Sequence, residues 1–121
     1  TNSVGTLFFT PSDSTFKKKF EKLNFGLKDI VKLELKSFYW KADTLYGNGK
    51  QFGGTYQQFK RVNESFVSYS HTNKFGFINW DAVRVAHLKA TQELAYKVEK
   101  QDVLIKDLQK QINELKKMSS K

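Results

Sequence analysis

Cysteine is absent from this chain, and histidine, methionine and proline are scarce, with two, one and one copies respectively. Without cysteine there are no disulfides and no thiolate ligands, and two imidazoles alone do not favour a transition-metal site. No apolar run approaches the roughly 20 residues that a helix needs to cross a bilayer. The first residues also lack the charged and apolar regions of a signal peptide. We therefore expect a soluble protein with no metal, no other cofactor and no membrane partner.

The chain has no initiating methionine, because it begins at Thr1 and its only methionine is Met118. We expect it to be a fragment or the tail of a longer protein. Its 121 residues are 39% apolar and 15% aromatic, which suits one domain with a small core. We then expect the domain to serve the part of the longer protein that precedes Thr1.

Acidic residues are the minority, with 12 against 21 Lys plus Arg, and the net charge is +9. The excess is diffuse, because residues 1–80 carry 12 basic and 6 acidic side chains and residues 81–121 carry 9 and 6. Such a surface permits nucleic acid, an anionic surface or an acidic protein as partner without selecting one of them.

The N-terminal third alternates between strand and helix patterns. "VGTLFFT", residues 4–10, is β-branched and aromatic and predicts a strand that stops at Pro11, which has no N–H to continue a ladder. From Ser14 the apolar positions follow helical spacing, which predicts a helix that ends near residues 24–26. Its apolar positions are Phe16, Phe20 and Leu23. "LKDIVKLEL", residues 27–35, is expected to start a second short helix.

The middle of the chain predicts strands. "LKSFYWKAD", residues 35–43, alternates so that Phe38 and Trp40 share one face, and the glycine-rich residues 46–54 favour a loop or an irregular β segment. "SFVSYS" and "FGFINW" are two strand-like runs joined by "HTNK", which predicts a hairpin over residues 65–80. The expected core residues are Phe38, Trp40, Phe66, Phe77 and Trp80.

From Asp81, a plausible N-cap, to the end there is neither glycine nor proline, and apolar residues recur alternately three and four positions apart. This spacing predicts a heptad helix whose interface is formed by Leu94, Val98, Gln101, Ile105, Leu108, Ile112 and Leu115. Gln101 is a lone polar residue in the seam, a device that fixes register. β-Branched a with Leu d favours two strands, whereas Val103 and Leu104 widen the apolar stripe toward a larger assembly. A helix that folds back on its own domain is the remaining alternative.

These patterns predict an α+β fold, in which a small domain of strands and short helices precedes a long C-terminal helix that forms a parallel, trimeric coiled coil. The expected boundaries are 1–11 for the end of an upstream segment, 12–80 for the α+β domain and 81–121 for the coiled-coil helix.

"PSDSTFK", residues 11–17, is open to two interpretations. A Ser-Asp pair after proline is common at helix starts, where Ser12 or Asp13 would cap the first turn. Alternatively, Ser12 is a nucleophile and Lys17 its general base, as in Ser-Lys variants of the catalytic triad. That chemistry needs a largely deprotonated lysine, which burial or nearby positive charge such as Lys18 and Lys19 favours.

Three stretches together resemble a known family. "SDSTFK" has the Ser-Asp opening and a lysine five residues after the serine, and "GLKDIVKLELKSFYWKAD" leads from a Leu-rich segment into an F-x-W-K strand. "FGFINWDAVRVAHLKATQELAYKVEKQDVLIKDLQKQINELKK" continues with a Gly-aromatic strand and a heptad tail. Residues 12–41 and 70–117 thus resemble the intramolecular chaperone auto-processing domain at the C-terminus of phage tail spikes and tail fibres, the endosialidase type. The family's central Gly-Phe-Ile-Ala-Gln-Glu stretch is not reproduced between Asp43 and Ser70.

The resemblance implies a homotrimer that aligns three copies of an upstream fibre or spike during folding. It also implies a virion tail location after synthesis in the host cytoplasm, and release by one self-cleavage between Pro11 and Ser12, with Ser12 and Lys17 as catalytic residues and Asp13 in support. A trimerisation module of the same fold that does not cleave stays open as an alternative.

An RNA-recognition module is a further alternative. "KFGFINW", residues 74–80, lies one glycine away from that module's aromatic strand signature, so Phe75 and Phe77 could stack on bases. Against it, a chain that stays helical after Asp81 leaves no fourth strand. We therefore do not expect a nucleic-acid partner.

Overall fold

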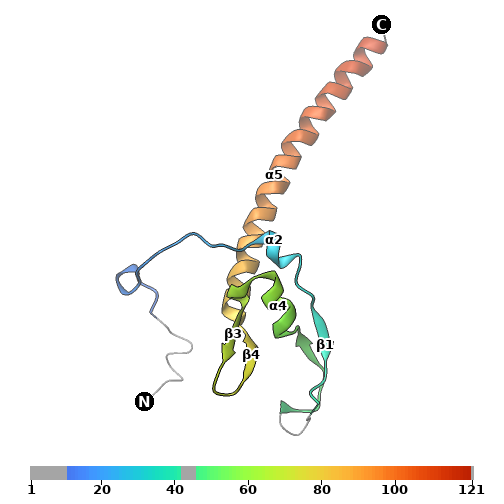
Figure 1. The fold of residues 1–121 in the computed structure, drawn as a ribbon. Coiled ribbons are helices and arrows are strands. Elements are labelled where there is room, and N and C mark those ends of the chain that lie inside the picture. The colour runs from blue at the N-terminus through green and yellow to red at the C-terminus, as the bar shows by residue number, and fades with distance from the viewer. Residues whose placement is uncertain (1–10, 42–45, 121) are drawn as a thin grey trace.

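The computed structural model describes residues 11–41 and 46–120 (Figure 1). Within them lie the 3-10 turn η1 (Ser14–Phe16), α2 (Leu27–Ile30), β1 (Lys36–Phe38), β2 (Gln51–Gly53), α4 (Tyr56–Val62), the 3-10 turn η2 (Glu64–Phe66), β3 (Val67–Ser70), β4 (Phe75–Ile78) and α5 (Trp80–Ser119). The predicted α+β class with a long C-terminal helix is confirmed. The strand predicted over residues 4–10 lies outside the described residues.

The described strands form two separate antiparallel pairs. In one, Lys36 pairs with Gly53 and Phe38 with Gln51, so the glycine-rich stretch does contain a short strand. In the other, β3 and β4 form the predicted hairpin. Phe38 and Trp40 share a face as predicted, with ring centroids 5.2 Å apart in an edge-on arrangement. The described residues thus lack the four-stranded sheet on which an RNA-recognition module stacks bases.

The core is small and is centred on Phe59 and Phe66, which are both 0% exposed. They pack with Val83 and Ala86 of α5, and the N–H of Asn79 donates to the carbonyl of Phe66 at 2.8 Å, which joins the hairpin end to the helix start. We use the word body for residues 25–93 as described, which contain this core.

The predicted core was only partly right. Phe66 is buried and Phe38 is half-buried. Trp40, Phe77 and Trp80 are 40%, 45% and 49% exposed, because they line an open pocket instead of filling the interior.

The helix predicted from Ser14 to about residue 24 was wrong. Only one 3-10 turn forms, and residues 11–24, which we call the arm, are all exposed and extend away from the body (Figure 1). A short isolated helix is marginal in water unless an apolar face packs on something. The arm has no such support among the described residues, since Phe16 is 76% and Phe20 73% exposed. Lys19 also has a φ of 57°, which is incompatible with a right-handed helix.

Helix α5 begins at Trp80, and its N-cap lies two residues earlier than predicted. Its N-cap is Asn79, whose side-chain oxygen accepts from the Ala82 N–H at 3.2 Å, and not Asp81. Asp81 instead lies in the first turn, where its carboxylate suits the positive end of the helix dipole and pairs with Arg84 at 3.1 Å. The body covers only the first part of this helix, by burying Val83, Ala86 and Ala90.

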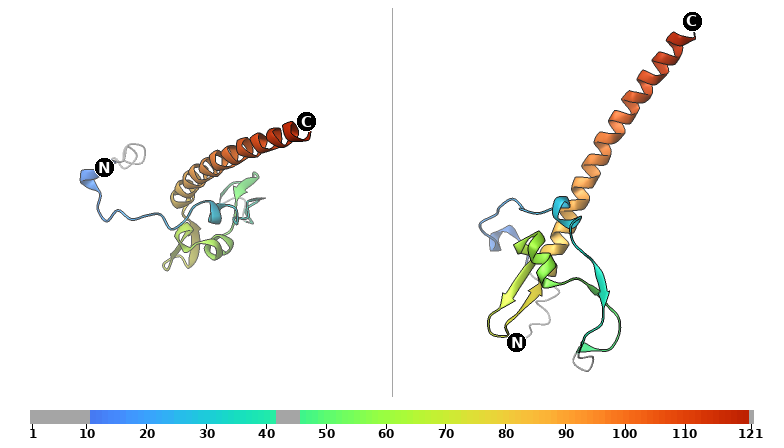
Figure 2. Two further views of the ribbon diagram at one scale, coloured as in Figure 1. Left: turned by 90° about the horizontal axis from the view of Figure 1, so that it is seen from above. Right: turned by 45° about the vertical axis from the view of Figure 1, so that its right-hand side comes forward.

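Beyond the body, α5 projects alone (Figure 1), and every described residue from 94 to 120 is exposed. The alternative of a helix that folds back on its own domain is therefore wrong for this chain. The views of Figure 2 agree that the arm leaves the body on one side and the β1–β2 pair lies on the other. No helix in the described parts of the chain has the length and apolar character needed to span a membrane.

Candidate functional site

The turn at the tip of the arm is built by Asp13. Its Oδ1 accepts from the Thr15 N–H at 3.0 Å and from the Thr15 hydroxyl at 3.1 Å, as expected of an N-cap. The backbone then closes, since the Phe16 N–H donates to the Asp13 carbonyl at 3.0 Å and the Lys17 N–H to the Ser14 carbonyl at 3.1 Å. This reversal returns the chain so that the side chain of Lys17 lies beside that of Ser12.

Lys17 and Ser12 are in direct contact, because Lys17 Nζ donates to Ser12 Oγ at 2.7 Å. The cap of the turn is Asp13, so the interpretation of Ser12 as the capping residue is wrong. The structure thus brings together the two predicted catalytic side chains, in a spacing that lets a hydroxyl exchange a proton with an amine. Their catalytic role stays a prediction.

Asp13 acts on the backbone and not on the amine. Its carboxylate is engaged by the Thr15 N–H and hydroxyl, and these two hydrogen bonds lower the pKa of Asp13 below its ordinary value. It is therefore charged at neutral pH and holds the turn. Its supporting role in catalysis stays a prediction.

The Ser12–Lys17 pair is fully open to water in the single chain. Pro11, Ser12 and Lys17 are exposed, and so are the neighbouring Lys18 and Lys19. A lysine acts as a general base only as the neutral amine, which burial favours over the ammonium ion. The single chain therefore has the geometry of the pair but does not exclude water from it.

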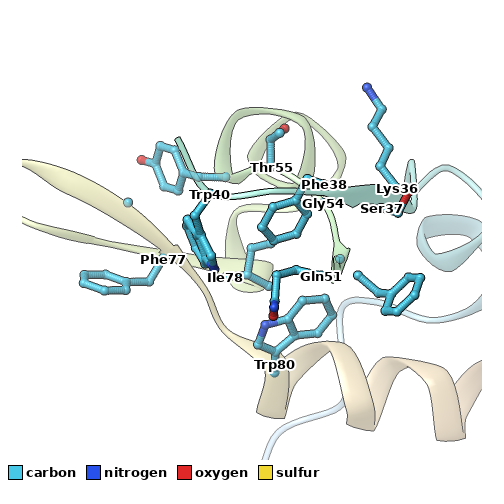
Figure 3. Close-up of a pocket in the computed structure, with 14 residues that line it drawn as sticks. Lys36, Ser37, Phe38, Trp40, Gln51, Gly54, Thr55, Phe77, Ile78 and Trp80 are labelled. Atoms are coloured by element: carbon cyan, nitrogen blue, oxygen red, sulfur yellow. The ribbon is translucent and has the colours of Figure 1, made fainter. Parts of the chain in front are cut away.

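A second feature, missed from the sequence, is an apolar pocket of about 630 Å³ between the two strand pairs (Figure 3). Trp40, Phe38 and Trp80 gather around it (Figure 3), and Gly53, Gly54 and Gly76 are among its lining residues. Trp80 also packs edge-on against the core residue Phe59, with centroids 5.7 Å apart. Its lining comes from residues 36–40, 51–56 and 76–80, and no local pattern could reveal a pocket assembled from such distant segments.

The predicted interface on α5 lies open along one side of the helix. Its apolar members are between 46% and 63% exposed: Leu94, Val98, Ile105, Leu108, Ile112 and Leu115. At 3.6 residues per turn, this seam near Leu94 and Val98 is rotated by roughly a quarter turn from the face that packs on the body. The body therefore sits beside the seam and leaves it accessible to another helix.

These features define a class: a small α+β module that carries a Ser-Lys pair on an exposed arm and an unpaired heptad helix at its C-terminus. Comparison with known proteins points to a family. The model of the family described as chaperone of endosialidase matches residues 12–68. This match supports an intramolecular chaperone domain of the kind found in phage tail proteins.

The family match begins at Ser12 and runs through the middle of the chain. It includes the stretch from residue 43 to residue 68, in which we found no family motif, and it does not extend over the expected C-terminal part from residue 70 to residue 117. No curated protein and no solved structure matches the chain.

Proposed function

We propose that this chain is a C-terminal intramolecular chaperone of a phage tail fibre or spike, which trimerises through α5, assists folding of the upstream segment and is then released by self-cleavage before Ser12. One observation carries the proposal: Lys17 Nζ lies 2.7 Å from Ser12 Oγ, at the first residue of the family match. The family match supports the chaperone role, and the contact supports the processing step.

The uncovered seam supports assembly. Six large apolar side chains between Leu94 and Leu115 are about half exposed in one chain, and a repeated apolar stripe of this length is typical of helices that associate. Three parallel helices would place the three bodies at the same end of the bundle, because each body packs on a neighbouring face of its own helix. The three arms would then start from equivalent positions below three copies of the upstream segment.

The cleavage follows from the position of the nucleophile. Ser12 Oγ attacks the carbonyl carbon of Pro11, and the neutral amine of Lys17 takes the hydroxyl proton. Because the nucleophile belongs to the residue on the amine side of the bond, the attack closes a five-membered ring. The C–N bond then breaks, the Ser12 nitrogen takes a proton from Lys17, and Pro11 is left as an ester on Ser12. One water hydrolyses the ester, which gives a Pro11 carboxylate, the Ser12 hydroxyl and a free amine at Ser12.

The test is the mass of the chain after folding with a longer upstream segment. We expect a product that begins at Ser12, no product from Ser12→Ala, and cleavage slower by roughly 10²- to 10⁴-fold for Lys17→Ala, the usual contribution of a general base. Lys22→Ala is the matched control, since it removes the same charge from an exposed position of the arm outside the turn, and it should cleave normally. An intact mass for the wild-type trimer would contradict self-processing and leave a trimerisation module that does not cleave.

A further inference from the structure

The body has an apolar pocket on one side and an apolar arm on the other. The pocket lies beside the β1–β2 pair, whereas the arm leaves the body on the opposite side in every view (Figures 1 and 2). Each copy of the chain has one arm and one pocket. Because the arm points away from the pocket of its own chain, it can fill the pocket of a neighbouring copy. Contacts of this head-to-tail kind close into a ring under rotational symmetry.

The pocket is lined by exposed aromatic side chains, which can pack against an aromatic side chain that enters it. Trp40, Phe77 and Trp80 are each between 40% and 49% exposed at its edge, and Phe52 on its rim is 78% exposed. Lys36 is the only charged residue among its lining residues, and its side chain points away from the aromatic cluster (Figure 3). The pocket therefore selects an apolar occupant.

The arm supplies such an occupant. Phe16 and Phe20 are 76% and 73% exposed, although phenylalanine is among the residues that are most often buried in folded proteins. The root of the arm is fixed, because the Leu27 N–H donates to Glu93 Oε1 of α5 at 2.9 Å and Gly26 N–H to Asp29 Oδ2 at 3.0 Å. From Phe25 an extended chain reaches about 30 Å to Phe16, enough to cross to an adjacent copy.

The pocket also adjoins the seam of α5. Counting back in heptads from Leu94 through His87 leads to Trp80, so this tryptophan occupies the position on the helix that continues the Leu94 row. Arg84, His87 and Thr91, which fill the seam positions between Trp80 and Leu94, are exposed as well. In a bundle formed through this seam, each pocket lies next to the neighbouring protomer.

We propose that the pocket around Trp40 and Trp80 binds the phenylalanine side chains of the arm, Phe16 and Phe20, from a second copy of this chain. The inference rests on the proposed trimer. It identifies the pocket of a second copy as the surface against which the Ser12–Lys17 pair docks. Phe16 lies between Ser12 and Lys17 in the turn, so docking of Phe16 carries the Ser12–Lys17 pair onto the surface of the neighbour and away from water. The neighbour thereby completes a site that is open to water in the protomer.

Fluorescence reads the pocket directly, because Trp40 and Trp80 are the only tryptophans of the chain and both line the pocket. In the full chain we expect Phe16→Ser/Phe20→Ser to shift the tryptophan emission to longer wavelength while the trimer persists. The matched control is Val31→Ser/Leu35→Ser, which removes two apolar side chains that are 68% and 72% exposed outside the pocket, and it should leave the emission unchanged. If the arm variant is a trimer with the same tryptophan emission as the wild type, the proposal is overturned.

Cross-linking identifies which copy supplies the arm. The chain has no cysteine, so Phe20→Cys with Phe52→Cys introduces the only two thiols. We expect oxidation to give covalent dimers and trimers, whereas Phe20→Cys with Lys60→Cys, on the exposed side of α4, stays monomeric on a non-reducing gel. Bonds within one chain, or none, in a protein that sediments as a trimer overturn arm exchange and leave the proposed function standing. A protein that sediments as a monomer overturns the proposed trimer, and arm exchange with it.

Discussion

Asp13 shapes the candidate site at the scale of single residues, because its carboxylate caps the turn that returns Lys17 to Ser12. Both of its hydrogen bonds, to the N–H and the hydroxyl of Thr15, are made by the ionised carboxylate. The hydrogen bonds lower the pKa of Asp13, so the ionised form and the turn stabilise one another. Protonation of this one group should therefore loosen the Ser12–Lys17 contact.

The pH dependence of the turn follows from the sign of that shift. A depressed pKa in the folded state means that Asp13 stabilises the turn at all pH values above its ordinary value of 3.8, and that this contribution is lost as pH falls below it. We expect the amide proton shift of Thr15, followed by NMR, to titrate with a midpoint below 3.8. Asp13→Asn keeps a capping oxygen and should remove the titration, and Asp13→Ala should remove the cap at every pH. A midpoint at or above the ordinary value would contradict the cap.

Gln58 joins α4 to the segment between α2 and β1. From α4 its side-chain oxygen accepts from the Glu34 N–H and its side-chain nitrogen donates to the Lys32 carbonyl, each at 3.0 Å, so it pairs with the backbone between α2 and β1 as a neighbouring strand would. This amide therefore sets the position of β1, and with it one wall of the pocket, relative to α4.

Loss of this amide should weaken the body measurably. We expect Gln58→Ala to lower the free energy of unfolding by about 1–2 kcal/mol, because two net hydrogen bonds are lost and water replaces them in part. The measurement is urea denaturation at one protein concentration. Gln57→Ala is the matched control, since it makes the same change in the same helix at an exposed position, and it should be nearly neutral. Equal effects of the two substitutions would show that the amide contacts contribute nothing.

Elements whose pattern is local were predictable from the sequence, and those that depend on a partner were not. The β3–β4 hairpin and α5 follow from alternation and from an uninterrupted helical repeat. Helix α4 was missed, because it is short, follows two glycines and buries only Phe59. The arm was wrongly predicted as a helix, since its spacing was right but no surface packs on it. At the site, residue spacing alone suggested the Ser12–Lys17 pair, but the cap by Asp13 and the pocket needed three-dimensional structure.

At the scale of the whole molecule, a single chain leaves large apolar side chains of α5 and of the arm exposed. Its core is confined to the body, while a helix of 40 residues extends far beyond it with an apolar stripe in water. The proposed assembly would bury this stripe along its length and leave the body in place, because the body packs on a different face of the helix. The proposed exchange of arms between copies would cover the exposed arm as well.

Two substitutions on different faces of α5 separate association from helix stability. Ile105 and Tyr96 are 61% and 60% exposed in the single chain, but only Ile105 belongs to the predicted seam. We expect Ile105→Ser to cost about 2–5 kcal/mol per chain, as for a large side chain truncated in a core, and to shift the sedimentation equilibrium toward monomer. Tyr96→Ser, which also truncates a large exposed side chain to serine, should leave the proposed trimer intact. Because stability is then linked to assembly, the Tm of the wild type should rise with protein concentration and that of Ile105→Ser should lie lower at each concentration. Identical behaviour of the two variants would place the interface elsewhere on the chain.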